Sequence, residues 1–272
     1  MTKIYITMKR KTKKHLIQTV CYILVVVIFF MSHKIGMAKT EFNNITIYYH
    51  DEVVTNDTVL TNLYQKIVNK FADKGFPLPK SNYSVYLCKS STEFKIKSIT
   101  FSNAVRGRNF LNLNRMYIQD ADIANDEVQA ASPALNKRTL SGTVAHELTH
   151  SYQQEKLGFF KNGIAPKWKL EGMGDYVANQ SSAKTADALP LFLNGETYSD
   201  TINCDKKIWE GVYFYFVSRL RVDYLFTYKK MSEDEFWNTD FDLEELDAEI
   251  RAAIKQGDYI FDNFVLQQTL TK

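Results

Sequence analysis

The chain has 272 residues, a formal net charge of +3 at pH 7 and a sequence pI of about 8.5. The excess positive charge comes from the N-terminus: residues 1–38 hold seven Lys and Arg and no Asp or Glu, so residues 39–272 carry a formal charge of −4. Because no Lys- and Arg-rich run with interleaved aromatic residues follows residue 39, the composition excludes a nucleic-acid-binding surface. Residues 39–272 are numerous enough for one sizeable domain, or for two lobes that share a cleft.

Residues 1–38 have the pattern of an export signal. Six basic residues precede an apolar run at residues 16–31, and Gly36-Met37-Ala38 supplies the small-x-small end of a cleavage site. The sixteen-residue run is slightly shorter than the roughly 18–20 residues that span a bilayer. A cleaved signal peptide is therefore expected, and an uncleaved membrane anchor through residues 16–31 is the alternative. Either way, residues 39–272 are expected to be exported: secreted or periplasmic, or tethered to the cytoplasmic membrane.

The first part of the exported chain predicts strands with one clear helix among them. Ile45–Tyr49 and Asn82–Cys88 are short runs rich in β-branched and aromatic residues, which is typical of strands. Leu111–Ile118 alternates in polarity and predicts a third strand. Thr58–Asp73 repeats its apolar residues at helical spacing, and Gly75 follows as a stop signal.

After about residue 139 the pattern becomes helical. Helices are predicted over Leu140–Leu157, Pro166–Asn179, Lys207–Val222 and Asp242–Lys255, and Ser232 begins a capping-box pattern. A strand-rich first half followed by a helical second half predicts an α+β fold.

Cysteine usage limits the kind of metal site that the chain can build. Cys21 lies within the predicted signal, which leaves Cys88 and Cys204 in the exported part. These two could form a disulfide in an oxidising compartment, or Cys88 could simply be a buried apolar residue at the end of its strand. Two cysteines without a CxxC motif cannot make a thiolate zinc site, so any metal must use His and carboxylate ligands.

The segment His146–His150, HELTH, contains two of the five histidines in the chain. Residues four apart lie on one face of a helix, so the two imidazoles can converge on one metal ion. Glu147 points beside such an ion and can accept a proton from a water that the metal activates. The alternative is an ordinary solvated helix face.

A third protein ligand is expected on the next predicted helix. Glu171 follows a loop that contains Gly158, Gly163 and Pro166, and a helix–loop–helix hairpin of this length can return Glu171 to the first helix. Asp175 lies one turn later on the same face, where it can accept the second ring N–H of a ligating histidine. The alternative for Asp175 is an acidic residue on the helix surface.

The spacing of these residues resembles that of the gluzincin metallopeptidases, the thermolysin-like MA clan. The pattern is His146-Glu147-x-x-His150, twenty intervening residues, and then Glu171-x-x-x-Asp175. The local form WKLEGMGDY is similar to the W-x-x-E-G-x-A-D-Y pattern of small secreted members, including plant basic secretory proteins. The resemblance is specific over residues 140–180 and only architectural elsewhere, and Gly174 departs from it by replacing the usual Ala.

The resemblance implies a single zincin-like domain over residues 39–272. A small mixed sheet with helices would form an N-terminal lobe, a helical lobe would follow, and the active-site cleft would lie between them. One Zn²⁺ would be bound by His146, His150 and Glu171, with Glu147 as general base and then proton donor. Part of Leu111–Ile118 would be the edge strand that pairs with an extended protein or peptide substrate.

The residue that stabilises the oxyanion is left open by the sequence. Such a hydrolysis needs a hydrogen-bond donor besides the metal. No histidine follows His150, so the candidates are Tyr176, Tyr213, Tyr215 and the distant His50.

Two classes of function are compatible with these residues. The first is a secreted or membrane-tethered zinc peptidase. The second is a zinc protein on the same scaffold that is non-catalytic or that hydrolyses a non-peptide substrate. The intact Glu147 favours the peptidase, because a binding module needs the metal ligands but not the base.

Overall fold

The computed structural model describes residues 14–20, 34, 36–50, 57–100, 105–129 and 132–262. The chain divides into two compact units, Met1–Ala38 and Lys39–Lys272. In the first unit residues 14–20 are helical, and most of the apolar run predicted as a signal or anchor lies outside the described residues. None of the helices in the described ranges is long and apolar enough to cross a membrane.

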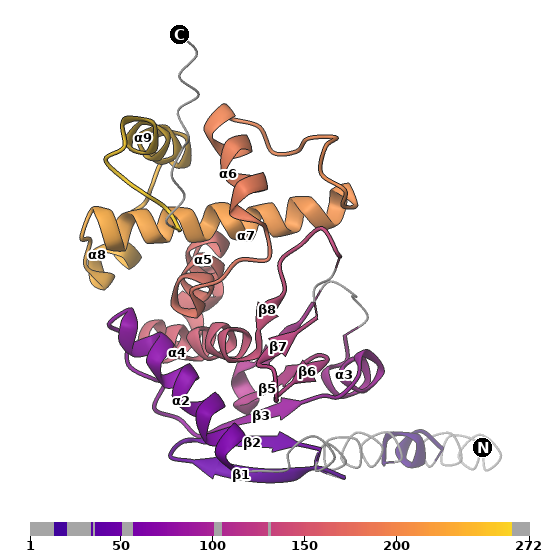
Figure 1. Ribbon diagram of the computed structural model, residues 1–272. Coiled ribbons are helices and arrows are strands. Elements are labelled where there is room, and N and C mark those ends of the chain that lie inside the picture. Colours follow the sequence, from indigo (N-terminus) through magenta and orange to yellow (C-terminus); the bar gives the residue numbers. More distant parts are fainter. Residues whose placement is uncertain are drawn as a thin grey trace, which may run out of the picture. The chain divides into compact units, whose positions relative to one another are not determined.

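The second unit is built on a five-stranded mixed sheet with the strand order β1-β2-β3-β5-β4 (Figure 1). The strands are β1 (Ala38–Phe42), β2 (Ile45–Tyr49), β3 (Tyr83–Leu87), β4 (Gly107–Phe110) and β5 (Arg115–Ile118). β2, β3 and β5 pair in parallel, whereas β4 pairs antiparallel with β5 and forms one edge of the sheet.

The centre of the sheet is a closely packed aromatic and aliphatic core. Tyr48, Tyr86 and Tyr117 lie in register on β2, β3 and β5, and their rings stack with centroids 4.6 and 4.9 Å apart. Val85 and Met116, which are paired neighbours on β3 and β5, are completely buried. Most residues of β2, β3 and β5 are buried, which explains why these segments are rich in β-branched and aromatic side chains.

The helices follow in order along the chain and lie mostly in its second half. They are α2 (Asp57–Asp73), α3 (Ser91–Ser98), α4 (Leu140–Ile164), α5 (Lys167–Ala178), α6 (Thr185–Asn194), α7 (Lys206–Asp223), α8 (Glu233–Asn238) and α9 (Leu243–Gln256). A π-helical turn, Tyr224–Tyr228, continues α7. A small antiparallel sheet of β6 (Ala121–Asp122), β7 (Glu127–Val128) and β8 (Arg138–Thr139) leads into α4. The prediction of an α+β fold is confirmed.

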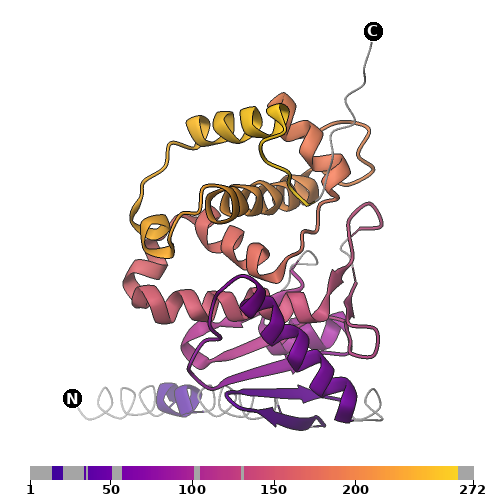
Figure 2. The same cartoon turned by 60° about the vertical axis from the view of Figure 1, so that its left-hand side comes forward.

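Helix α4 occupies the middle of the second unit (Figures 1 and 2). It packs against α2, β4 and β5 on one side and against α5 on the other, and α7 packs on α5. Gly172 allows the last contact, because a Cβ at this position would clash with the Ser218 carbonyl oxygen of α7. The predicted helix over Leu140–Leu157 ends as expected at Gly158, whose φ of 76° and ψ of 164° interrupt the helix before a further turn.

The predicted strand over Leu111–Ile118 is wrong in its first half. Leu111–Leu113 form a 3₁₀ turn, and Asn114 then adopts the left-handed conformation with φ of 49°, which asparagine tolerates better than most residues. The remaining residues form β5, which lies between β3 and β4. The strand at this edge of the sheet is therefore β4, not a part of Leu111–Ile118.

The two cysteines of the second unit do not pair. Cys88 is completely buried at the end of β3, and Cys204 lies in the loop before α7; both are free thiols. Burial raises the pKa of the Cys88 thiol, so it stays protonated and behaves as a small apolar side chain.

Candidate metal centre

The HELTH segment lies in the buried first half of α4. Thr139 caps the helix, its hydroxyl oxygen accepting a hydrogen bond of 3.0 Å from the Gly142 N–H. Leu140, Val144 and Leu148 are completely buried between the sheet and α5. Because apolar residues hold this part of the helix inside the protein, the polar residues between them are forced into the interior as well.

Three side chains from α4 and α5 converge on one point. The Nε2 atoms of His146 and His150 are 3.2 Å apart, and the Glu171 Oε2 atom lies 3.4 and 3.5 Å from them. Ligand atoms bound to zinc at about 2.0–2.1 Å in a tetrahedral arrangement are about 3.3–3.4 Å from one another. The separations in this triad therefore fit a metal ion bound by all three residues, with a fourth position left open.

Hydrogen bonds on the far side of each imidazole orient the two rings. His146 Nδ1 is 2.8 Å from Asp175 Oδ1, and His150 Nδ1 is 2.9 Å from Gln153 Oε1. The Gln153 amide group donates to the Leu170 carbonyl oxygen at 2.9 Å, which directs its own oxygen toward His150. Both oxygens accept, so each Nδ1 carries a proton and donates a hydrogen bond, and each Nε2 faces the triad, where it offers a lone pair to a metal once it is deprotonated.

Arg138 extends this chain of interactions beyond Asp175. Its guanidinium donates to the same Asp175 Oδ1 at 2.6 Å, and the Asp175 side chain is completely buried. Burial alone would raise the pKa of Asp175, but Arg138 and His146 outweigh it and lower that pKa. Asp175 is therefore ionised, in the position that its spacing from Glu171 predicted.

Without a metal, protons bind this triad tightly. Burial alone would lower the pKa of His146, but hydrogen bonds to the Asp175 and Glu171 carboxylates raise it to about 10. Burial would likewise raise the pKa of Glu171, yet hydrogen bonds to His146 and His150 hold it far below the usual range. A metal ion must therefore displace at least one proton when it binds.

Glu147 lies beside the triad, packed against β4. Its side chain is buried, and within the described ranges no residue forms a hydrogen bond with its carboxylate. A Cβ at Gly107 would fall within 3.0 Å of the Glu147 carboxyl carbon, so this close approach requires glycine on the edge strand. Burial raises the pKa of Glu147, while positive charge on His146 and His150 opposes the rise.

Asn109 holds the edge strand against α4. Its amide group donates to the Glu147 backbone oxygen at 2.6 Å and to the Ser151 hydroxyl at 2.8 Å. The position of β4 relative to the triad is therefore fixed by a side chain as well as by packing.

A cavity of about 250 Å³ opens beside His146 and Glu147. Tyr215 of α7 lines it; the ring lies 6.2 Å from that of His146, and the hydroxyl is close enough to the Glu171 carboxylate to be influenced by it. The other tyrosine candidates are committed elsewhere: the Tyr176 hydroxyl pairs with Thr227, and the Tyr213 hydroxyl donates to the Glu196 carbonyl oxygen. Of the tyrosines considered from the sequence, Tyr215 alone lines this cavity.

His50, the fourth candidate for the oxyanion donor, is not part of the site. Its ring hydrogen-bonds to the Glu93 carboxylate at 2.9 Å. It belongs to a separate polar contact between the end of β2 and α3.

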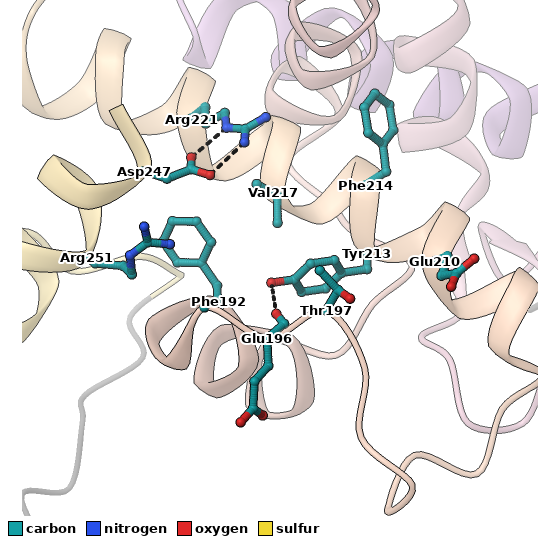
Figure 3. A pocket seen from close by; sticks show the side chains of 11 residues that line it. Phe192, Glu196, Thr197, Glu210, Tyr213, Phe214, Val217, Arg221, Asp247 and Arg251 are labelled. Atoms are coloured by element: carbon teal, nitrogen blue, oxygen red, sulfur yellow. Dashed lines mark hydrogen bonds and ion pairs between the residues drawn. The ribbon is translucent and has the colours of Figure 1, made fainter. Parts of the chain in front are cut away.

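A second cavity of about 400 Å³ lies between α6, α7 and α9 and contains none of the triad residues (Figure 3). Two of its polar contacts are internal: Arg221 forms two hydrogen bonds of 2.7 Å with Asp247, and the Tyr213 hydroxyl donates to the Glu196 backbone (Figure 3). Arg251 stacks over the Phe192 ring at 5.3 Å. These contacts join the three helices and provide no nucleophile, base or metal ligand set.

Gly174 of α5 faces the ring of His146. A Cβ at this position would lie 2.8 Å from the His146 Cε1 and Nδ1 atoms. Such a contact is too short, so alanine would displace either the ring or helix α5. Gly174, which replaces the alanine of the gluzincin pattern, is therefore required for α5 to pack this closely against His146.

No known protein family matches the chain, and no curated protein is significantly similar to it. The resemblance to gluzincins therefore rests on the motif residues alone.

Several residues of the site were not identified from the sequence. Gln153 is three residues after His150 on the same helix, so the sequence predicts that it lies on the same face as His150. The sequence does not predict its hydrogen bond with His150 Nδ1. Arg138, Asn109 and Gly107 come from two short strands, and no local pattern links them to the motif.

Zinc affinity should rise with pH. The pKa of His146 in the metal-free protein is about 10, so its proton competes with the metal throughout the neutral range. Each proton released on binding makes the apparent Kd change about tenfold per pH unit. We expect the Kd measured by competition with a chromophoric chelator to fall at least tenfold per unit from pH 6 to 8. A Kd independent of pH over this range would show that no ligand is protonated.

Gly174→Ala should weaken zinc binding without unfolding the protein. Displacement of the His146 ring should raise the zinc Kd by about ten- to a hundredfold, the range for losing the support of a metal ligand. Alanine is also the better helix former, by about 1 kcal/mol, so thermal stability should not fall in parallel. Gly163→Ala is the matched control, because a Cβ there meets no atom within 4 Å. An unchanged zinc Kd in Gly174→Ala would mean that α5 moves instead of the ring.

Proposed function

We propose that this protein is an exported zinc-dependent metallopeptidase of the gluzincin type, with a zincin-like fold. In this proposal the sheet, α2 and α4 form the N-terminal lobe, and α5 to α9 form the helical lobe. The N-terminal segment directs export, with the protein secreted, periplasmic or tethered to the cytoplasmic membrane.

The choice of zinc is supported by the chemistry of the triad. Two imidazole nitrogens and one carboxylate oxygen, with a fourth position open, are a typical ligand set for catalytic zinc. Harder ions such as Mg²⁺ and Ca²⁺ prefer oxygen ligands only. When bound, zinc would supply a water of lowered pKa and polarise the carbonyl of the substrate.

The observation that carries the proposal is the buried carboxylate of Glu147 beside the three converging ligand atoms. The Glu147 carboxylate lines the cavity and has no hydrogen-bond partner among the described residues, so it is free to exchange a proton with a bound water. Glu147 would accept the proton of the attacking water at its carboxylate and return it to the departing amine. Burial shifts the pKa of Glu147 toward neutral pH. A pKa near the working pH suits a group that first accepts a proton and then returns it.

Tyr215 is the residue we assign to oxyanion stabilisation. Its hydroxyl lies near Glu171 and its ring near His146, in the cavity where the carbonyl oxygen would be held. Burial and the surrounding carboxylates raise the pKa of Tyr215, so the phenol keeps its proton and remains a donor.

The sheet edge supports a peptide as the substrate. β4 pairs on one side with β5, and none of the described strands pairs with its other side, so outward-facing backbone groups are available for an extended chain. Gly107 at the start of β4 lies against Glu147, so a peptide added to this edge would pass beside the base. A zinc protein that is non-catalytic, or that hydrolyses a non-peptide substrate, would not need this arrangement.

Glu147→Gln tests the proposed reaction. The amide keeps the size of the side chain but cannot accept the proton, so hydrolysis should fall by at least about 10²-fold. The measurement is release of fluorescent fragments from a labelled unfolded protein, with zinc content determined in parallel. Glu244→Gln on the exposed face of α9 is the matched control and should leave both values unchanged. Wild-type protein that holds zinc but hydrolyses nothing would favour the non-catalytic alternative.

A further inference from the structure

The cavity beside His146 and Glu147 has a strongly asymmetric charge. Three cationic residues line it, namely Arg106, Arg138 and Lys207. Among its lining residues the only acid is Glu147, which the proposed reaction already uses. The cavity therefore has more positive charge than it can neutralise from its own walls.

Arg106 contributes most to this imbalance. Its Nε atom is buried and has no hydrogen-bond partner, and no acid in the described part of the chain forms an ion pair with its guanidinium. Burial lowers the pKa of Arg106, and only the charge of Asp120 opposes that effect. A partly desolvated guanidinium without a counter-ion is unfavourable unless an anion binds to it at some stage.

Arg138 leaves a second donor free. One nitrogen of its guanidinium is committed to Asp175 at 2.6 Å, whereas its Nε atom is buried without a partner. The two arginines reach the cavity from different elements, Arg106 just before β4 and Arg138 from β8.

The rest of the cavity favours an anion carried on a short aliphatic stem. Leu135, Ile208 and Val212 supply an apolar wall, and apolar walls strengthen an ion pair by excluding water. Arginine pairs particularly well with carboxylates because its planar group donates two parallel hydrogen bonds.

We propose that this cavity is a subsite for a substrate carboxylate, with Arg106 as its ion-pair partner. The inference rests on the proposed function, because Arg106 directly precedes Gly107, where the substrate strand would pass Glu147. The carboxylate belongs to an Asp or Glu side chain next to the cleaved bond, or to the C-terminus of the peptide. Both sources present the same group to Arg106, and the experiment separates them.

The test uses fluorogenic peptides that differ by one group. Glu replaces Gln at each of the four positions around the cleaved bond, and a free C-terminus replaces a C-terminal amide. We expect one Glu-for-Gln pair, or the acid–amide pair, to differ in kcat/KM by at least tenfold in favour of the carboxylate. The pair that responds identifies the source of the carboxylate.

Substitutions at Arg106 should remove this preference. Arg106→Gln should bring the ratio close to one, and Arg106→Glu should reverse it in favour of a Lys-containing peptide. Arg106→Lys keeps the charge and should retain part of the preference, which separates a loss of charge from a loss of fold. Lys137→Gln is the control: it removes one positive charge from a residue 66% exposed, outside the cavity.

Binding to zinc-loaded Glu147→Gln protein separates failure of the subsite from failure of the peptidase proposal. If fluorescence anisotropy gives at least tenfold tighter binding of the carboxylate peptide, and Arg106→Gln abolishes the difference, the subsite stands whether or not the wild type cleaves. Cleavage by the wild type with no preference for a carboxylate would overturn the subsite and leave the peptidase proposal intact. Equal binding of all peptides by an inactive wild type would overturn both.

Discussion

Two hydrogen bonds donated by histidine Nδ1 atoms determine where the candidate ligand atoms of this protein point. Asp175 and Gln153 each accept a hydrogen bond from one ring, so both Nε2 atoms face the Glu171 carboxylate. Arg138 in turn keeps Asp175 ionised although the carboxylate is completely buried. Breaking one partner of such a buried pair would leave an uncompensated charge in the interior. The geometry of the triad therefore depends on residues that do not touch the metal position.

The same constraint explains the placement of helix α4. A helix that carries His146 and His150 can be buried here because both rings have hydrogen-bond partners, while Glu147 lines the cavity. α5 supplies Glu171 and Asp175 on one side, and Asn109 on β4 ties the helix backbone on the other. A glycine allows α5 and β4 each to pack closely against α4: Gly174 of α5 faces the ring of His146, and Gly107 of β4 faces the carboxylate of Glu147.

The parts of the structure that follow local rules were predictable. α2, α5, α7 and α9 show apolar residues at helical spacing, and the capping box at Ser232 is formed as expected. α6 was missed because Pro190 lies inside its short sequence, and β4 because GRNF has no alternating pattern. The edge strand was assigned to the wrong segment, since strand order depends on contacts between distant residues and not on the sequence of one strand.

The same distinction between local and long-range contacts applies to the residues of the candidate site. The motif residues, Glu171 and Asp175 were identified because each is related to the next by one turn of a helix or by one hairpin. Arg138 and Asn109 reach the site through strand pairing, and nothing near them in the sequence predicts it. The cationic cavity likewise forms only when β4, β8 and α7 meet, so its charge could not be read from composition.

The most direct test of this account is elemental analysis of the purified protein after exhaustive dialysis, with Glu171→Ala measured beside it. We expect about one zinc per chain in the wild type and a zinc Kd at least tenfold higher in Glu171→Ala. Glu244→Ala should bind zinc as the wild type does. A wild-type protein that retains no zinc, or a Glu171→Ala protein that retains as much as the wild type, would contradict a site built by His146, His150 and Glu171.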